Sequence, residues 1–396
     1  MLRVLMVSDV YFPRINGVST SIATFRHALA ACGVEVRLLV PRYGDEAPEA
    51  GVVRVRGRTV PRDPEDRLVG WRAMHAAALE EAADCDLVHV QTPFVAHYAG
   101  IAAARAQNKP ALLTYHTFFE EYLHHYAPFL PAFALRALAR RISRSQCNAV
   151  DGVIVPSTAM RDRLAGYGVR RPMHVLPTGI PLRDFAAGDR ARFRSRHDLP
   201  EEAPVALFIG RVAHEKNIGF LLQVAARMRS TLPDFILLVA GEGPALGDLR
   251  RETRRLGLER TVRFVGYLDR HLELPDCYAA ADVFAFASRT ETQGLVLLEA
   301  MSAGLPVVAV AEMGTADILA GERGARIAPA NVDGFAAVLG QVLANPDLRT
   351  QLSRDARAYS AEWADDIMAA RLATLYRSTL GERAPQAAQA APALPG

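Results

Sequence analysis

The feature that most constrains the fold is a pattern that runs through the chain twice, in which short apolar segments alternate with helical ones. In the first half the apolar segments are 4–7, 36–40, 52–55, 87–90, 111–114 and 153–155, with helices expected at 18–31, 68–83 and 97–106. In the second half they are 205–209, 235–240, 262–265, 283–287 and 307–309. Strands that alternate with helices form parallel sheets with helices on both faces. The sequence therefore predicts an α/β protein with two Rossmann-like, doubly wound domains in tandem.

The two halves are separated by a stretch rich in proline and polar residues, from about 172 to 202. We assign residues 1–182 to an N-terminal domain and residues 183–360 to a C-terminal domain. A helix over 361–380 is expected to pack back on the N-terminal domain. The tail, 381–396, is rich in alanine, proline and glutamine and is predicted to be disordered.

Composition excludes several classes of protein. The 396 residues are 50% hydrophobic and 22% charged, with a formal net charge of only +3, which is too small for a nucleic-acid coating protein. The four cysteines form no CxxC pair, which argues against a zinc site or a disulfide framework. No apolar run reaches the ~18 residues of a membrane span. The first residues are typical of a buried strand rather than a signal peptide. We expect a cytoplasmic protein.

Ligands of doubly wound sheets bind beyond the carboxyl ends of the strands, and two such domains predict a cleft between those ends. The clearest loop begins at Glu291, after the strand 283–287. Gly294 lets a ligand approach the backbone, and the amides of Leu295 and Val296 at a helix N-terminus favour phosphate. Glu291 and Glu299 would be about 12 Å apart along a helix. This spacing suits the sugar and ribose ends of a nucleotide-sugar, although an amphipathic helix can carry two such glutamates without binding anything.

Two further loops of the second half follow strands. Arg211 and Lys216 come after the strand 205–209 and place two cations where they could neutralise a diphosphate leaving group, unless they belong to a solvated basic loop. Gly241 and Gly243 follow the next strand. Their spacing misses the dinucleotide fingerprint by one residue, so we predict a tight turn lining the nucleotide pocket rather than NAD binding.

The first half supplies Gly17, before a helix, and His116, at the end of a strand. Gly17 could pack against the diphosphate, although an ordinary turn explains it equally well. His116 could hydrogen-bond the donor sugar because of its place at the strand end, although a lone histidine is more often structural. The triplet from Asp84 to Asp86 would suit a metal, yet it precedes its strand and so lies at the wrong end of the sheet. No metal site is predicted.

Together these loops resemble the family 4 retaining glycosyltransferases, which have the two-domain GT-B fold. The strongest match is ETQGLVLLEAMSAGLPVVA at 291–309, preceded in order by PTGI at 177–180, GR…EKN at 210–217 and GEGP at 241–244. The resemblance covers residues 1–380. It departs at Asn16, where the family often has a second glycine, and at Gln293, where an aromatic residue is common.

The resemblance implies a role for each matching residue. Arg211 and Lys216 would bind the donor diphosphate, Glu299 the ribose hydroxyls, and Glu291 the sugar. Backbone amides at Gly294, Leu295 and Val296 would meet the phosphates, and backbone near Tyr267 the base. Gly17 would touch the diphosphate and His116 the sugar. Such enzymes use no metal or other cofactor and transfer the sugar on the face from which the diphosphate leaves. The predicted catalytic set is His116, Arg211, Lys216 and Glu291.

The acceptor is expected to bind the stretch 115–151, where aromatic side chains precede a basic helix. These residues are Phe118, Phe119, Tyr122, Tyr126, Arg136, Arg140, Arg141 and Arg144. Aromatic and basic residues together suit a surface of anionic lipid, although core aromatics beside a solvated helix would look the same. The stretch also resembles the diacylglycerol glycosyltransferases within family 4.

The sequence thus predicts a retaining hexosyltransferase that takes a UDP- or GDP-linked sugar and acts on a membrane lipid at the inner face of the cell membrane. Three alternatives remain open. They are transfer to a soluble or polyprenyl-linked saccharide, a nucleotide-sugar-binding module without turnover, and a nucleotide-sugar epimerase of the same fold. No nucleic-acid partner is expected. The base and the sugar of the donor stay undetermined.

Overall fold

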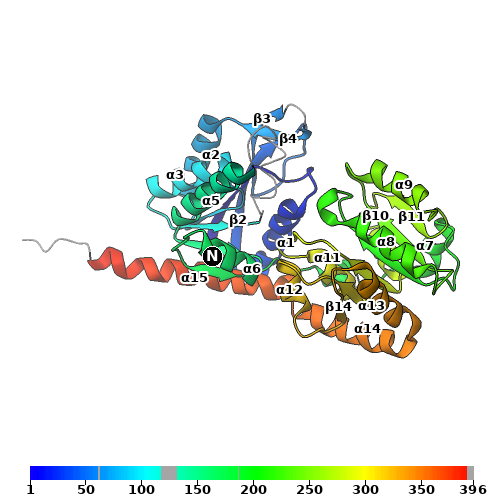
Figure 1. Ribbon diagram of the computed structural model, residues 1–396. Helices are drawn as coiled ribbons and strands as arrows, with labels where there is room; N and C mark the ends of the chain where they lie inside the picture. Colours follow the sequence, from blue (N-terminus) through cyan, green and yellow to red (C-terminus); the bar gives the residue numbers. More distant parts are fainter. Residues whose placement is uncertain (61–62, 117–131, 186, 390–396) are drawn as a thin grey trace, which may run out of the picture. The chain divides into compact units, whose positions relative to one another are not determined.

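The computed structural model describes residues 1–60, 63–116, 132–185 and 187–389 (Figure 1). The chain forms two compact units. Unit 1 comprises residues up to Gly179 and the segment from Asp365 onward, and unit 2 runs from Ile180 to Ala364. The chain therefore passes between the units twice, whereas the predicted boundaries lay after residues 182 and 360.

Unit 1 contains an eight-stranded sheet in the order β4-β3-β2-β1-β5-β6-β7-β8. Its strands are β1 (Leu2–Val7), β2 (Val34–Arg42), β3 (Val52–Val60), β4 (Asp63–Val69), β5 (Leu87–Val90), β6 (Ala111–Thr114), β7 (Gly152–Val155) and β8 (Met173–Val175). Its helices are α1 (Gly17–Ala31), α2 (Trp71–Ala83), α3 (Val95–Ala106), α5 (Ala132–Asn148), α6 (Thr158–Gly166) and α15 (Asp365–Gln389). Neighbouring strands are parallel except β3 and β4, which are antiparallel.

The core of unit 1 joins the two ends of the chain. Ile22 and Leu29 of α1 are fully buried and belong to the same apolar cluster as Leu372 and Tyr376 of α15. Each such side chain contributes about 1.5–3 kcal/mol when it leaves water. The last described helix is thus part of the fold of unit 1 and not an appendage of unit 2.

Unit 2 contains a six-stranded parallel sheet in the order β11-β10-β9-β12-β13-β14. Its strands are β9 (Val205–Ile209), β10 (Ile236–Ala240), β11 (Val262–Gly266), β12 (Val283–Phe286), β13 (Val307–Ala309) and β14 (Ala325–Ile327). Its α-helices are α7 (Arg190–Arg196), α8 (Ile218–Met228), α9 (Leu246–Arg255), α10 (Leu274–Ala280), α11 (Leu295–Ser302), α12 (Gly314–Leu319), α13 (Val332–Ala344) and α14 (Pro346–Ala361). Two 3-10 turns are η1 (Leu182–Phe185) and η2 (His214–Lys216).

Both sheets reverse their strand order once, between β1 and β5 in unit 1 and between β9 and β12 in unit 2. At such a switch point the loops after the two strands diverge to opposite faces of the sheet, which leaves a crevice where ligands bind. The loops after β9 and β12 carry Arg211, Lys216 and Glu291. The predicted donor residues therefore lie at the place where this topology favours a ligand.

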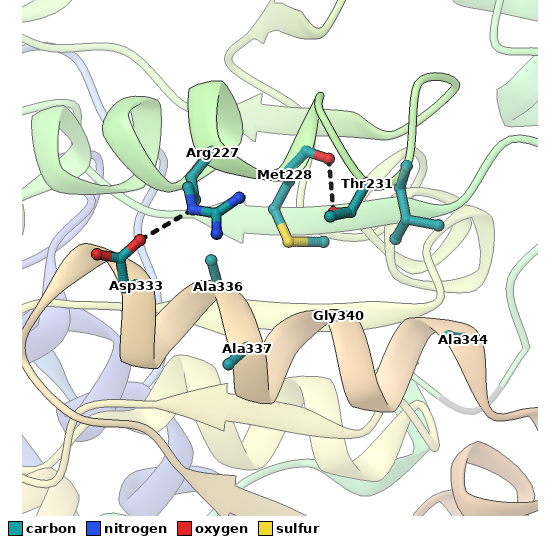
Figure 2. Close-up of a pocket in the computed structure, with 9 residues that line it drawn as sticks. Arg227, Met228, Thr231, Asp333, Ala336, Ala337, Gly340 and Ala344 are labelled. Carbon is teal, nitrogen blue, oxygen red and sulfur yellow. Dashed lines mark hydrogen bonds and ion pairs between the residues drawn. The ribbon is translucent and has the colours of Figure 1, made fainter.

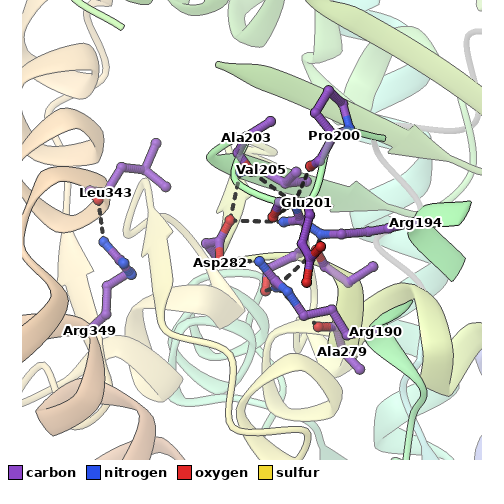
Figure 3. A network of polar contacts seen from close by, with 12 residues as sticks. Arg190, Arg194, Pro200, Glu201, Ala203, Val205, Ala279, Asp282, Leu343 and Arg349 are labelled. Carbon is purple, nitrogen blue, oxygen red and sulfur yellow. Dashed lines mark hydrogen bonds and ion pairs between the residues drawn. The ribbon is translucent and has the colours of Figure 1, made fainter. Parts of the chain in front are cut away.

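The stretch predicted as a linker is divided between the units: residues 172–179, with β8, belong to unit 1. The rest folds into unit 2 through a polar network around Asp282 (Figure 3). Arg194 of α7 is only 3% exposed. It donates to the carbonyls of Pro200 and Ala280, at 2.7 and 2.9 Å, and pairs with Asp282 at 3.2 Å. Arg190 pairs with the other oxygen of Asp282 at 3.1 Å. A buried guanidinium needs this many acceptors, because an unpaired buried charge is costly.

Several elements differ from the sequence-based expectation, and the strands β8 and β14 were not predicted at all. The predicted helix 68–83 is confirmed over 71–83 as α2, whereas residues 68 and 69 end a strand, β4, that was not predicted. The strand was missed because an exposed edge strand, which pairs on one side only, has no alternating apolar pattern. The structure continues α15 to Gln389, into the tail 381–396 predicted to be disordered, and residues 390–396 of that tail lie outside the described residues. In the part of the chain that the structure describes, no helix is both long and apolar enough to span a membrane.

Candidate functional site

The strand ends of unit 2 are packed backbone against backbone. Val212 donates its N–H to the carbonyl of Glu242 at 2.8 Å, and Gly241 donates to the carbonyl of Gly266 at 2.7 Å. Gly241 has φ of +129°, and a Cβ there would lie 2.0 Å from the carbonyl oxygen of Gly210. A Cβ on Gly243 would lie 2.4 Å from that of Val212. The glycines are therefore required by this close approach, which makes the edge of the sheet rigid.

An ion pair joins the loops after β9 and β12. The ammonium of Lys216 contacts the carboxylate of Glu291. Asn217, in the left-handed conformation with φ of +55°, donates its side-chain amide to the carbonyl of Ala287 at 3.2 Å. About a fifth of the Lys216 side chain and a sixth of the Glu291 side chain remain exposed, 21% and 16%. The structure thus brings together two of the predicted catalytic residues, and Asn217 supports them.

Arg211 lies in the same loop and is more open. Its guanidinium contacts Glu215, and 54% of its side chain is exposed. Burial opposes ionisation of Glu215, but hydrogen bonds and Arg211 outweigh burial and lower its pKa. The pair is therefore ionic at neutral pH. An incoming anion can reach Arg211 without displacing any buried contact.

The helix α11 begins at Leu295 directly after Gly294, whose φ is +92°. The amides of Leu295 and Val296 are in the first turn, where a helix supplies no acceptor for its N–H groups. The loop is held from behind by Gly314, which donates its N–H to the carbonyl of Glu291 at 2.8 Å. These features make the start of α11 suited to an anion.

Glu299, at the other end of the E-x7-E element, is buried and held by two donors that the sequence did not reveal. Its exposed fraction is 7%. Arg270 donates to Oε1 at 2.7 Å, and the hydroxyl of Tyr278 donates to Oε2 at 3.1 Å. Burial and then the neighbouring carboxylate raise the pKa of Tyr278 well above its ordinary value, so the phenol keeps its proton. Tyr267, predicted near the base, is 55% exposed just after β11.

In unit 1, Gly17 is the first residue of α1, and a Cβ built on it would meet nothing within 4 Å. The glycine is not needed for packing and leaves open space at this helix start. Asn16, where the sequence departs from the family pattern, is the N-cap of α1. Its side-chain oxygen accepts the N–H of Ser19 at 2.9 Å. This capping role was not predicted.

His116 follows β6, and its Nε2 lies 2.9 Å from Oε1 of Gln91, which follows β5. Burial lowers the pKa of His116 to about 4, so its ring is neutral at neutral pH. A neutral imidazole offers one donor and one acceptor. It is therefore suited to hydrogen-bond a hydroxyl rather than to bind an anion as a cation.

The basic helix α5 presents its arginines to solvent. Arg136, Arg140, Arg141 and Arg144 are all exposed, and Arg140 lies over the ring of Tyr167, 5.5 Å from its centre. Two apolar side chains of the same helix are also exposed, Phe133 at 76% and Leu138 at 47%. The predicted aromatic residues Phe118, Phe119, Tyr122 and Tyr126 lie outside the described residues.

Comparison with known proteins identifies the family of this chain. Residues 15–184 match the family described as Glycosyltransferase Family 4, and residues 189–359 match the one described as Glycosyl transferases group 1. An alpha-monoglucosyldiacylglycerol synthase from Streptococcus pneumoniae is 31% identical, over 91% of this chain and 83% of that protein. The chain belongs to glycosyltransferase family 4.

Two other relatives show how broad this similarity is. A GDP-mannose-dependent alpha-mannosyltransferase from Mycolicibacterium smegmatis is 27% identical over 98% of this chain and all of that protein. A structure of Anabaena HepE in complex with UDP and glucose superposes with a TM-score of 0.75 at 18% identity, covering 96% of this chain and 100% of the other. The fold of this family 4 glycosyltransferase is therefore GT-B, as the sequence predicted.

Acidic residues elsewhere in this family 4 glycosyltransferase have structural partners. Asp86 accepts the N–H of Arg3 at 2.8 Å, before β5 and at the amino end of the sheet. Asp9, to which the sequence assigned no role, accepts the N–H of Ala96 at 3.0 Å and so caps α3. Across the described residues, no group of three or more histidine, cysteine, aspartate or glutamate side chains is arranged to hold a metal.

A hollow of about 320 Å³ lies on unit 2 between α8 and α13, apart from the predicted residues (Figure 2). Its walls include Met228, Thr231 and Gly340, and Arg227 pairs with Asp333 at 2.9 Å on its rim. None of the residues predicted to bind donor or acceptor lines it.

Proposed function

We propose that this chain is a retaining hexosyltransferase that moves a sugar from a UDP- or GDP-linked donor to a membrane lipid such as diacylglycerol or a glycolipid. The observation that carries the lipid part is the exposed basic and apolar face of α5. The name of the pneumococcal relative, an alpha-monoglucosyldiacylglycerol synthase, supports the same acceptor class. The protein would act peripherally, on the inner face of the cell membrane.

The donor is proposed to bind along the strand ends of unit 2. Arg211, Lys216 and the amides at the start of α11 would hold the diphosphate. Glu291 would accept hydrogen bonds from the sugar, Glu299 from the ribose, and backbone near Tyr267 would contact the base, with Gly241 and Gly243 lining the pocket. On unit 1, Gly17 and His116 are proposed for the diphosphate and the sugar. Support comes from the rigid glycine packing and from the Lys216–Glu291 pair at the switch point.

The proposed step needs no protein nucleophile. The bond between the anomeric carbon and the diphosphate oxygen breaks, and the acceptor hydroxyl oxygen forms a bond to that carbon on the same face. The hydroxyl proton passes to the departing diphosphate, so charge and atoms balance. Arg211 and Lys216 stabilise the negative charge that grows on the diphosphate. Donors preorganised toward developing charge are typically worth 10²–10³ in rate, about 2.7–4 kcal/mol.

The acceptor surface is proposed to extend beyond α5. Arg170 and Arg171 are exposed in the loop before β8, and the N–H of Arg170 donates to the side chain of Asn148, at the end of α5, at 2.8 Å. The arginines of α5 and this loop thus form one basic surface, with Phe133 and Leu138 available to enter the lipid interface. Near an anionic membrane each arginine contributes about 1 kcal/mol, which falls as salt is added.

The first test is a screen of donors against acceptors with mass spectrometry of the products. UDP- and GDP-linked hexoses are paired with diacylglycerol in mixed micelles and with soluble saccharides. We expect a glycolipid product. A product formed only on a soluble saccharide would overturn the lipid acceptor and support polysaccharide assembly, and nucleotide binding without any product would overturn the enzyme itself.

A second test isolates the membrane surface. Co-sedimentation with vesicles containing anionic lipid is compared for the native protein and a variant with Arg140, Arg141 and Arg144 replaced by alanine. The matched control replaces Arg250, Arg251 and Arg254 of α9, which removes the same charge from exposed positions in unit 2. We expect the α5 variant to lose most of its binding and the control to keep it. Equal loss would mean that net charge, rather than this surface, governs binding.

Metal independence is part of the proposal and needs its own measurement. The stabilising charge is assigned to arginine and lysine, so we expect turnover to survive dialysis against EDTA and to be unchanged by added Mg²⁺ or Mn²⁺. A loss of turnover that added metal restores would contradict this part of the proposal.

A further inference from the structure

The carboxylate of Glu299 is held by residues that lie outside the E-x7-E element. One side is Tyr278, 1% exposed, and the other is Arg270, whose side chain is 29% exposed. The guanidinium of Arg270 lies 5.2 Å from the ring centre of Phe185, and Phe185 meets Tyr278 edge to face at 5.7 Å. Two residues, from α10 and the loop before it, thus hold one carboxylate of α11, and Phe185 of η1 packs against both of them.

Arg270 lies in a turn that is held by several hydrogen bonds to Asp269. The carboxylate of Asp269 accepts the N–H groups of His271 and Leu272, both at 2.9 Å. The carbonyl of Asp269 also accepts the N–H of Leu274 at 2.9 Å. Burial disfavours the charge of Arg270, but Glu299 outweighs burial and raises the pKa of Arg270. The guanidinium is therefore charged and held in place before any ligand arrives.

The hydrogen-bonding capacity of this carboxylate suggests its purpose. An ionised carboxylate has about four lone-pair sites, two on each oxygen. Arg270 uses one site on Oε1 and Tyr278 uses one on Oε2. One acceptor site is then left on each oxygen, and a vicinal diol has two O–H donors. The match between two free acceptor sites and two hydroxyls is what a ribose would need.

We propose that Arg270 and Tyr278 are positioning residues for the donor, which fix the Glu299 carboxylate so that both ribose hydroxyls meet acceptor atoms already in place. This inference rests on the proposed donor site. Without its partners, the buried carboxylate would be free to rotate, and a rotated carboxylate would no longer offer both acceptor atoms in place. The two residues act through Glu299 and not on the reacting atoms.

The test measures ribose discrimination rather than affinity alone. Calorimetry gives the dissociation constants of UDP and 2′-deoxy-UDP, or of the GDP pair if GDP binds better, and their ratio is compared between variants. Arg270→Met keeps the length of the side chain over Phe185 but removes the charge. We expect it to weaken the ribonucleotide roughly tenfold and to bring the ratio close to one, with kcat changed far less than the donor KM. Arg270→Lys should restore part of the ratio, and Tyr278→Phe should lower it less than Arg270→Met.

The control is Arg250→Met, since Arg250 also lies over a phenylalanine ring, Phe264 at 5.9 Å. It should leave the ratio unchanged. If Arg270→Met weakens both nucleotides equally, or fails to fold while Arg270→Lys and Tyr278→Phe keep the native ratio, Arg270 and Tyr278 are merely structural and the inference is wrong. That result would leave glycosyl transfer intact, whereas failure of the proposed function would appear as no product with any donor in the native protein.

Discussion

The two sheets have the same strand order around their switch points, but different groups form their carboxyl edges. In unit 2 the edge is made of backbone packed on backbone, with glycines where a Cβ would come within 2.0–2.4 Å of a carbonyl, and with an ion pair across the switch point. In unit 1 the edge is made of helix caps and the neutral imidazole of His116, and a Cβ on Gly17 would meet nothing within 4 Å. One topology therefore leaves the chemistry of each edge to its loops.

The two edges should therefore differ in how well they tolerate amino-acid substitutions. A rigid, backbone-built edge holds its geometry before a ligand binds, which is what stabilisation of a charged leaving group requires. An edge built from side chains and caps can vary more freely with the acceptor. The predictions that follow contrast one change in each unit, from the largest expected effect to the smallest.

Gly241→Ala should be the most damaging single change. Its Cβ would overlap the carbonyl oxygen of Gly210 at 2.0 Å, and its φ of +129° disfavours any side chain. We expect loss of unit 2 stability of about 3 kcal/mol or more and loss of donor binding. Gly17→Ala, in open space at a helix start, should cost no stability. Thermal unfolding and nucleotide calorimetry measure both, and equal effects would break the proposed contrast between the edges.

Lys216→Ala should lower kcat by about 10²–10³, because it removes the charge proposed to stabilise the leaving diphosphate. Glu299→Ala should instead act mainly on donor KM, since its proposed contacts are with the ribose and not the reacting atoms. Lys109→Ala, which changes the only other lysine of the chain, is the control in unit 1. Steady-state kinetics separate the cases, and unchanged kinetics in both variants would overturn the assignment of the donor site.

Acid should weaken unit 1 more than unit 2. Burial lowers the pKa of His89 to about 3 and of His97 and His116 to about 4. In unit 2 burial also lowers the pKa of His197, which is one histidine against three, and His214 and His271 are mostly exposed. In the unfolded chain the histidine pKa is near 6.5, so the unfolded chain takes up protons at a higher pH than the folded protein does. The stability of unit 1 is therefore full above pH 6.5 and falls as the pH drops toward 4. Each histidine contributes about 1.4 kcal/mol per pH unit.

Hydrogen exchange at pH 7.5 and pH 5, corrected for intrinsic rates, measures this difference unit by unit. His97→Leu should flatten the dependence in unit 1, and His214→Ala should leave it unchanged. Parallel loss of protection in both units would show that these buried rings do not control the acid stability of unit 1.

The smallest effect is expected at two matched helix caps. Asn16 caps α1 in unit 1 and Asn331 caps α13 in unit 2, each by accepting an N–H three residues on, at 2.9 and 2.8 Å. Replacement by alanine should cost about 1 kcal/mol in either case. Only Asn16→Ala should also raise the donor KM, because it loosens the helix start at Gly17. An equal KM in both variants would remove Gly17 from the proposed donor site.

Much of the site could be predicted because its signals are local. The eight-residue spacing of Glu291 and Glu299 spans one helix start, and strands such as 87–90, 111–114 and 205–209 are continuous apolar runs whose observed bounds agree with the prediction. The edge strand β4 was not predicted, and α15 extends past the end predicted for it, since neither segment has an apolar pattern that marks it. The capping role of Asn16 had a recognisable signal, an asparagine three residues before Ser19, that was not used.

The sequence by itself determined the alternation of strands and helices, the order of the loops and the residues that follow each strand, because these depend on neighbours along the chain. Only the tertiary structure decided which side chains meet across it. Arg270 and Tyr278 reach Glu299 from 29 and 21 positions away along the chain. Tyr376 is hydrogen-bonded to His89, which lies 287 positions away. Such partners are selected by burial, where a polar group must find a complement wherever the fold places one, and no local pattern records that choice.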